Sequence, residues 1–341
     1  ISSTGAANTT GALDLSNSAS VEAVTVDAST DLTVGGAFGA NADYAAGADI
    51  TITGAGSVDL SAAALATDID SVDASGNSGG VAFEVGDGAV AVTGGSGDDV
   101  VDLAALAQTE DVDLGEGTDT VIFSGSGNYN ATVARLSNAE VLRADGTGTF
   151  DVSRLTGLES LQVQSGGTVT FSEVGASTPI RVINNITTDL DINLANVAGA
   201  ADTVNLTIDD IDATAAAITV GTVDVAGVEN LNITTADGLD AGTAHIITDL
   251  TNSADLETIT VSGDSDLTIT NATAPTGELT IDGSGFTNAL TVGAAGTSGL
   301  SAGDNFTGGS GDDGLFVDHG VLGTTTSING GEGDDTLSVR G

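Results

Sequence analysis

The sequence predicts an all-β protein folded as a right-handed parallel β-solenoid, a β-helix or β-roll of many short coils. Three observations predict it: short segments that alternate apolar and polar residues recur along the chain, acidic glycine-rich turns interrupt them, and the apolar residues are mostly small or branched. Aromatic residues make up only 3% of the chain, and Met, Trp and Cys are absent. Such side chains fit the thin interior of stacked coils better than a wide globular core.

The commoner repeat reads apolar, acidic, any, apolar, any, apolar, and it ends in the alternation of a half-buried strand. Clear copies occupy 21–26, 158–163, 228–233 and 256–261, and looser copies occupy 69–74 and 139–144. Further alternating segments cover 31–34, 49–52, 167–171, 217–220, 266–269 and 278–281. A sandwich would also contain short, regularly spaced strands, but one pattern repeated over most of the chain favours a solenoid.

Helix is expected to be scarce. The segments 61–65, 103–106 and 133–136 are rich in Ala and Leu, but they are long enough only for a turn or two where the chain crosses between coils.

The charge is strongly one-sided, with 49 Asp and Glu against 5 Lys and Arg and a formal net charge of −44. Nucleic acids and anionic membranes would repel such a surface, so a cationic partner is expected. A hydrophobic content of 40% still argues for a folded core rather than a disordered chain. No apolar run reaches the roughly 18 residues of a membrane span. We therefore expect a soluble chain without membrane insertion, the mature piece of something larger.

A second repeat carries the chemistry. The segments 94–102, 308–316 and 330–338 fit the pattern Gly-Gly-x-Gly-x-Asp-x-apolar-x. A fourth copy, 114–122, has Leu114 in place of the first glycine, and a fifth, 299–307, is degenerate but keeps Asp304.

This spacing suits Ca²⁺. Glycines allow positive φ and can turn carbonyl oxygens inward, the aspartate adds a hard anionic oxygen, and the apolar residue begins the next strand. Ca²⁺ takes six to eight oxygens, so two turns must stack, about 18 residues apart. Asp99 precedes Asp119 by 20 residues and Asp313 precedes Asp335 by 22, so each pair needs a small insertion. For the second pair, 317–329 is expected to form that bulge.

These turns resemble the calcium-binding repeats of the RTX family, proteins exported by type I secretion that include toxins, proteases, adhesins and S-layer proteins. The remaining ladders, poor in Lys, look like the body of a Gram-negative S-layer protein. The resemblance implies Ca²⁺ bound by aspartate carboxylates and turn carbonyls. The residues it assigns to metal binding are Gly95, Ser96, Gly97, Asp98, Asp99, Gly115, Gly117, Asp119, Asp304, Gly309, Ser310, Gly311, Asp312, Asp313, Gly331, Glu332, Gly333, Asp334 and Asp335.

Plainer interpretations stay open beside these. The turns could be ordinary turns without metal, above all at Asp304, and the missing glycine at Leu114 puts the shape of its turn in question. An acidic residue recurs at one strand position, at Glu22, Glu140, Glu159, Glu229 and Glu257. These residues either form a ladder of metal sites or, as we expect, face solvent or pair with backbone groups at coil corners.

No catalytic site is expected. The two histidines, His245 and His319, are far apart in sequence and belong to no zinc motif. Aromatic and cationic groups are too few to build a typical pocket that stabilises a developing anion. Carboxylate pairs are too numerous for counting alone to rule out a glycosidase or lyase dyad.

The sequence thus predicts four segments: solenoid over 1–93, a calcium-binding segment over 94–122, solenoid over 123–298 and a second calcium-binding segment over 299–341. The expected function is structural, at a bacterial cell surface, where Ca²⁺ folds the coils and bridges subunits of a self-associating lattice or filament. The alternatives are a secreted adhesin or carbohydrate-binding module, with cell-surface polysaccharide as partner, and the non-catalytic region of a secreted enzyme.

Overall fold

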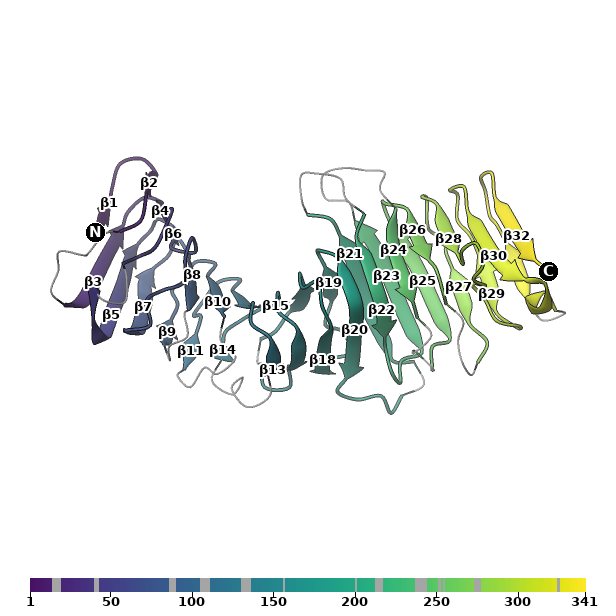
Figure 1. The fold of residues 1–341 in the computed structure, drawn as a ribbon, viewed down its shortest axis with the longest axis horizontal. Helices are drawn as coiled ribbons and strands as arrows, with labels where there is room; N and C mark the ends of the chain where they lie inside the picture. Colours follow the sequence, from purple (N-terminus) through teal and green to yellow (C-terminus); the bar gives the residue numbers. More distant parts are fainter. Residues whose placement is uncertain are drawn as a thin grey trace. The chain divides into compact units, whose positions relative to one another are not determined.

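The computed structural model is all-β, and parallel sheets stack into a β-solenoid of about 13 turns (Figure 1). It describes every residue except 14–19, 40–42, 86–89, 105–110, 130–135, 156, 200, 212–216, 237–243, 251–252, 254, 273–276 and 324–325. The chain divides into two compact units, one of Ile1–Gly146 with Arg154–Ser160 and the other of Thr147–Ser153 with Leu161–Gly341. Each unit contains one of the two predicted acidic segments.

The first unit contains a seven-stranded parallel sheet and a second run of parallel strands, and the chain alternates between them coil by coil. The seven-stranded sheet consists of β1 (Ser2–Ser3), β3 (Val21–Ala28), β5 (Tyr44–Gly54), β7 (Ile69–Asn77), β9 (Ala91–Thr93), β11 (Val112–Asp113) and β14 (Leu136–Ser137). The second run consists of β2 (Asn8–Thr10), β4 (Leu32–Val34), β6 (Val58–Asp59), β8 (Val81–Val85), β10 (Val100–Leu103), β12 (Thr120–Phe123) and β15 (Val141–Ala144). The short strand β13 (Gly127–Tyr129) also belongs to this unit.

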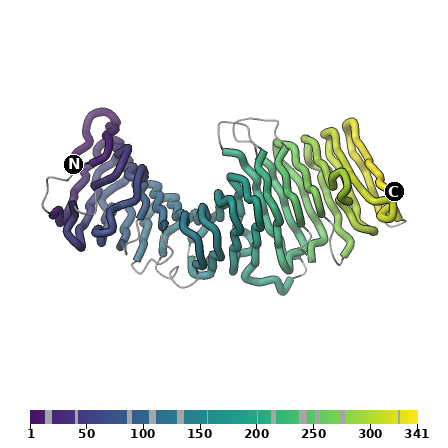
Figure 2. Tube along the Cα trace, viewed as in Figure 1, coloured from purple at the N-terminus to yellow at the C-terminus, as the bar shows by residue number. Residues whose placement is uncertain are grey.

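The second unit repeats this plan with two further runs of parallel strands (Figure 2). One consists of β17 (Ser160–Val163), β19 (Ile180–Val182), β21 (Thr203–Asp209), β23 (Asn230–Ala236), β25 (Thr258–Gly263), β27 (Thr280–Asp282), β29 (Asn305–Thr307) and β31 (Ser327–Asn329). The other consists of β16 (Gly148–Asp151), β18 (Val169–Val174), β20 (Ile186–Leu194), β22 (Thr219–Asp224), β24 (His245–Asp249), β26 (Leu267–Ile269), β28 (Leu290–Val292), β30 (Gly314–Asp318) and β32 (Thr336–Arg340).

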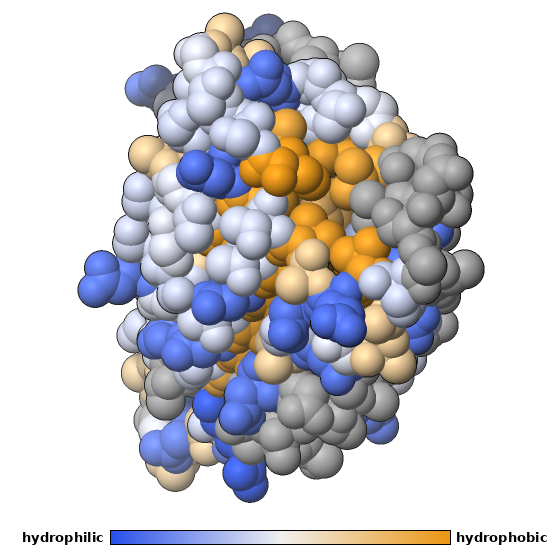
Figure 3. All heavy atoms as spheres, turned by 90° about the vertical axis from the view of Figure 1, so that its left-hand side faces the viewer, coloured by the Kyte–Doolittle hydropathy of each residue, from blue (hydrophilic) through white to orange (hydrophobic). Residues whose placement is uncertain are grey.

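The core is a set of ladders formed by the inward residues of successive strands. Val101, Val121 and Leu142 lie in register on β10, β12 and β15, and none is more than 1% exposed. Phe150 and Phe171 make the same kind of pair on β16 and β18, with ring centroids 5.8 Å apart. Each buried residue of this size contributes about 1.5–3 kcal/mol by leaving water. Viewed from the end that carries β1, apolar side chains gather at the centre with polar ones around them (Figure 3).

The predicted alternating segments all fall on strands, so the period-2 pattern is confirmed as the local signal for this fold. The two copies at 21–26 and 69–74 lie on β3 and β7 of the seven-stranded sheet, whereas those at 139–144, 158–163, 228–233 and 256–261 belong to β15, β17, β23 and β25. One sequence pattern therefore serves two different sheets, because both need inward apolar residues at alternate positions.

Two expectations about connections need correction or restriction. The segment 61–65 forms turns, Leu103 ends β10 and Leu136 begins β14, while 105–106 and 133–135 lie outside the described residues. The prediction that all of 317–329 bulges is wrong, because β30 runs on to Asp318 and Ser327–Asn329 is the next strand. Between them lies the 3-10 helix η3 (His319–Val321). In the part of the chain that the structure describes, no helix has the length and apolar character needed to cross a membrane.

Candidate metal centre

The first glycine-rich turn, residues 94–99, joins β9 to β10 and ends in a buried aspartate. Asp99 is 1% exposed, and its carboxylate accepts two backbone amides. Gly95 N donates to Asp99 Oδ2 at 2.9 Å within the turn, and Val81 N of the preceding coil donates to Asp99 Oδ1 at 2.8 Å. The carboxylate therefore closes its own turn and also holds β8 against β10.

The next turn, residues 115–119, stacks on the first in strand register, because Val100 pairs with Thr120. Asp119 is fully buried, and its Oδ1 accepts Asp99 N at 2.7 Å. Thr118 N donates to Asp98 Oδ1 at 2.9 Å, so the exposed aspartate of the first turn also binds the second. The predicted stacking of the two turns is confirmed.

The second unit contains the same arrangement in residues 308–313 and 330–335, and Gly314 pairs with Thr336. Five hydrogen bonds of this second stack have a counterpart in the first stack. Within and before the first turn, Asp313 Oδ2 accepts Gly309 N (2.6 Å) and Asp313 Oδ1 accepts Leu290 N (2.7 Å). Between the two turns, Asp313 N donates to Asp335 Oδ1 (3.0 Å), Asp334 N to Asp312 Oδ1 (2.9 Å), and Glu332 N to Gly309 O (2.9 Å), the last of which matches Glu116 N to Gly95 O (2.9 Å). Two segments far apart in sequence therefore fold by the same contacts, which indicates that the motif itself determines the geometry.

Glycine is required in the first and in the second turn of each stack for different reasons. Positive φ occurs in the second turn of each stack, at Gly115 (91°), Gly117 (140°), Gly331 (101°) and Gly333 (112°). The expectation of positive φ is wrong for the first turns, where Gly95, Gly97, Gly309 and Gly311 lie outside the left-handed region. Space requires glycine there instead: a Cβ would lie 2.0 Å from Asn77 O at Gly95 and 1.9 Å from Phe286 O at Gly309.

Leu114, which replaces the first motif glycine of the fourth copy, leaves the shape of its turn intact. The turn keeps the contacts and the positive φ values of its counterpart in the second unit, where Gly330 occupies this position. Leu114 itself is fully buried. The position therefore tolerates an inward apolar side chain, and the doubt about this turn is removed.

One carboxylate oxygen is left over in the first stack. In the first turn, Gly95 N donates to the motif aspartate, but in the second turn Gly115 N donates to Asp113 Oδ1 at 3.2 Å instead. The second unit does the same, since Gly331 N donates to Asn329 Oδ1 at 3.3 Å. As a result Asp119 Oδ2 is buried and has no hydrogen-bond partner. A buried carboxylate oxygen without a partner is costly unless a cation or a proton satisfies it.

The electrostatics of the stack agree with this geometry. Burial raises the pKa of Asp119 to about 7; the bond from Asp99 N lowers the pKa, and the charges of Asp99, Glu140 and Asp98 raise it. Burial also raises the pKa of Asp99 and of Asp313, although each accepts two backbone amides that lower it. The stack thus concentrates negative charge in a low-dielectric place, where a cation would relieve the repulsion.

Asp304 does not join either stack. It precedes β29, in the sheet run opposite to β30, and both its oxygens accept backbone amides, from Leu279 N at 2.9 Å and from Ser301 N at 2.6 Å. Its carboxylate is buried and fully engaged in holding its own turn and the preceding coil. Asp99 and Asp313 accept two amides in the same way, so Asp304 differs from them in its place outside the two stacks and not in its hydrogen bonds.

One acidic residue of the commoner repeat, Glu140, lies one coil after Asp119 and makes the contact that Asp119 makes with Asp99, which the sequence analysis did not predict. Glu140 Oε2 accepts Asp119 N at 2.8 Å, and Glu229 Oε2 accepts Asp202 N at 2.8 Å. These two glutamates cap backbone groups at coil corners, as expected. The signal in the sequence was the spacing of 21 residues between Asp119 and Glu140, close to that between Asp99 and Asp119. Glu22, Glu159 and Glu257 are exposed on their strands or beside them.

The donor set of the stacks fits a hard cation. Carboxylate and carbonyl oxygens line the turns, and Asp119 Oδ2 has no other partner. Ser96, Asp98, Ser310, Asp312, Glu332 and Asp334 are exposed, and so is Asp335, although its Oδ1 accepts Asp313 N. Among the described residues, no three Asp, Glu, His or Cys side chains converge on a point where a metal could bind. A Ca²⁺ ion held here would therefore take backbone carbonyls as well as carboxylates.

The fold and the stacked turns define the class of this chain as an acidic β-solenoid. Neither a protein-family model nor a curated protein matches the sequence.

Proposed function

We propose that this chain is a calcium-dependent structural protein of a bacterial cell surface, in which Ca²⁺ folds the acidic turns and joins subunits into a lattice or filament. The observation that carries the proposal is Asp119 Oδ2, a buried and unpartnered carboxylate oxygen in the Asp99–Asp119 stack. The same turn contacts occur again in the second unit. The resemblance of both turns to RTX repeats supports Ca²⁺ as the cation and secretion as the route to the surface.

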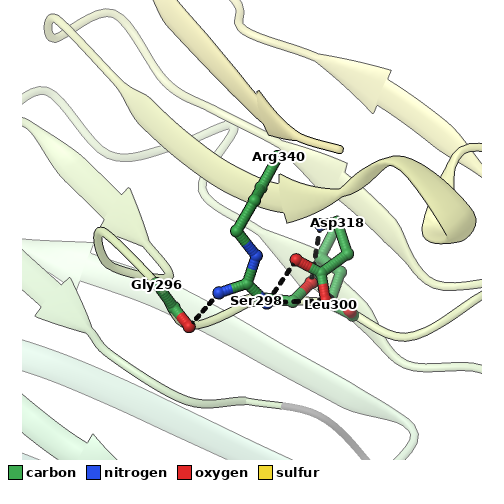
Figure 4. A network of polar contacts seen from close by, with 5 residues as sticks. All are labelled: Gly296, Ser298, Leu300, Asp318 and Arg340. Atoms are coloured by element: carbon green, nitrogen blue, oxygen red, sulfur yellow. Dashed lines mark hydrogen bonds and ion pairs between the residues drawn. The ribbon is translucent and has the colours of Figure 1, made fainter.

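Calcium would supply the positive charge that the chain lacks. Of the five Lys and Arg, Arg181 is paired with Asp209, and Arg340 lies between Asp318, 2.6 Å away, and Gly296 O (Figure 4). These pairs neutralise individual carboxylates, but the net charge of −44 already counts all five cationic residues, so internal pairing leaves it unchanged. A chain so charged is destabilised by self-repulsion, and a cation that binds only the folded state stabilises that state.

Self-association is supported by the carboxylates exposed on the outer surface. Exposed carboxylates such as Asp98, Asp312 and Asp334 lie at the rim of the motif turns, where a divalent ion can bridge two copies. The hollow beside Arg340, of about 260 Å³, is lined by only a few strand-end and loop residues and contains no cluster of varied catalytic groups. A structural role makes use of the repeated surface and does not need a pocket.

The second candidate function is a secreted adhesin or carbohydrate-binding module. Such a module could act alone or as the non-catalytic region of a secreted enzyme. It is favoured by polar ladders on the outer face of the second unit. Asn232 Nδ2 donates to Asn205 Oδ1 at 2.9 Å, and the hydroxyls of Thr234 and Ser262 are 3.1 Å apart. Rows of amides and hydroxyls at strand spacing can hydrogen-bond a surface polysaccharide.

Electron microscopy and sedimentation of the purified chain, with Ca²⁺ or with EGTA, separate the two candidates. The structural proposal predicts ordered sheets or fibres that form in Ca²⁺ and dissolve in EGTA. Discrete particles in Ca²⁺ that bind bacterial polysaccharide would favour the adhesin, and particles indifferent to Ca²⁺ would contradict the proposal.

A further inference from the structure

Asp99, Asp119 and Glu140 occupy one position of the coil in the first unit. Each is the residue immediately before a strand, and the strands pair in register, Val100 with Thr120 and Thr120 with Val141. The first two belong to the glycine-rich turns, whereas Glu140 belongs to the commoner repeat, which has no glycine-rich turn. The column thus passes from one kind of repeat into the other.

The three residues are linked by one type of contact. Asp119 Oδ1 accepts Asp99 N at 2.7 Å, and Glu140 Oε2 accepts Asp119 N at 2.8 Å. The carboxylates of Asp119 and Glu140 therefore each lie against the backbone of the acidic residue one coil before. This arrangement brings the Glu140 carboxylate beside the residue whose second oxygen, Asp119 Oδ2, is buried without a partner.

From this placement we infer that Glu140, from outside the glycine-rich motif, is part of the cation site of the Asp99–Asp119 stack and acts through its charge beside Asp119 Oδ2. The inference rests on the proposed calcium binding and deepens it. Asp99 has little to offer a cation beyond its charge, because both its oxygens accept amides. Asp119 Oδ2 is the free oxygen, and Glu140 adds a negative charge next to it, which strengthens the attraction of a divalent ion.

The chain contains a matched control for Glu140. Glu229 in the second unit accepts the amide of an acidic residue, Asp202, at the same distance of 2.8 Å. Asp202 lies in no glycine-rich turn, and no oxygen of its carboxylate is among the buried unpartnered atoms of the described residues. Glu229 therefore has the backbone contact of Glu140 without the cation site.

The test compares E140Q, E229Q and D119N in the whole chain by isothermal titration with CaCl₂ after removal of bound metal. The amide oxygen of glutamine still accepts the backbone amide, so E140Q removes charge and keeps the fold, which far-ultraviolet circular dichroism verifies. A parallel set carries D335N, which removes a charge from the second stack and keeps an oxygen that can accept Asp313 N. The inference predicts that E140Q weakens calcium binding by about tenfold and that E229Q leaves the affinity unchanged.

Two results would overturn the inference, and they differ in what they say of the proposed function. Weaker binding in D119N with wild-type affinity in E140Q would exclude Glu140 and leave the calcium stack in place. Equal losses in E140Q and E229Q would assign the effect to general surface charge and would also overturn the inference. Absence of calcium binding in the wild-type chain would remove both the inference and the proposed function.

Discussion

Asp119 Oδ1 accepts the backbone amide of Asp99 at 2.7 Å, so the carboxylate of one coil holds the backbone of the coil before it. Asp335 and Asp313 repeat this relationship at 3.0 Å in the other unit. Acidic side chains at this position thus have a role in folding even before any metal is considered.

The motif glycines of the first turns are predicted to be required for space. In G95A the added Cβ would lie 2.0 Å from Asn77 O, which is backbone and cannot move aside without shifting a coil. We expect a loss of about 2–4 kcal/mol in unfolding free energy, measured by thermal unfolding. G285A is the control, because a Cβ at Gly285 would meet no atom within 4 Å. Equal stability of G95A and G285A would refute the close stacking of the turns.

Restoring the consensus glycine is predicted to harm the protein. Leu114 is fully buried, and its turn already has the contacts of the complete motif. L114G should therefore lose about 3 kcal/mol or more of stability from the missing side chain and the more flexible backbone, without a gain in calcium affinity. Chemical denaturation and calcium titration measure the two effects. Tighter calcium binding in L114G would show that Leu114 distorts the turn.

Without metal, stability is predicted to fall as the pH rises from about 4 to about 7. The pKa of Asp119 is raised from 3.8 to about 7, so the folded state keeps a proton that the unfolded state has lost. Its contribution is complete below the unfolded pKa and is lost as the pH rises through the folded pKa. Unfolding midpoints in EGTA should drop by several degrees across this range, and less in D119N. The same slope in D119N and wild type would contradict the environment described for Asp119.

The two ion pairs are predicted to differ in importance. Asp209 is 8% exposed, and its Oδ1 has no hydrogen-bond partner, so R181A leaves a buried charge and should cost about 2–3 kcal/mol. Arg340 and Asp318 have side chains 51% and 43% exposed, and R340A should cost about 1 kcal/mol or less. Thermal unfolding of both variants under the same salt conditions checks the order. A larger loss in R340A would reverse it.

Much of the fold was predictable because a half-buried strand has apolar and polar residues at alternate positions of its sequence. Copies such as 228–233 and 256–261 contain Leu231 and Ile259, which pair in one buried ladder, as the shared pattern predicts. The stacking of Asp99 on Asp119 was predictable for the same reason, since the turn motif gives the spacing. The sheet to which each strand belongs was not predictable, because β3 and β15 have the same sequence pattern and lie in different sheets.

The site was predictable only in part. Position 304 matches the motif, yet Asp304 precedes β29 and lies outside both stacks, which depends on where the neighbouring coils lie. To predict that Glu140 follows Asp99 and Asp119 in one column, the length of each coil must be known, and insertions change that length from coil to coil. Asp119 Oδ2 has no partner because Gly115 N donates to the side chain of Asp113 instead.

Thermal unfolding of the whole chain at a series of free Ca²⁺ concentrations measures whether Ca²⁺ stabilises the folded acidic turns. Circular dichroism follows the loss of strand signal, and equal concentrations of Mg²⁺ control for ionic strength. We expect a midpoint that rises continuously with Ca²⁺, equivalent to about 2.7 kcal/mol for each site at 100 times its dissociation constant, and a smaller rise in D119N. Identical midpoints in EGTA, Mg²⁺ and Ca²⁺ would contradict this expectation.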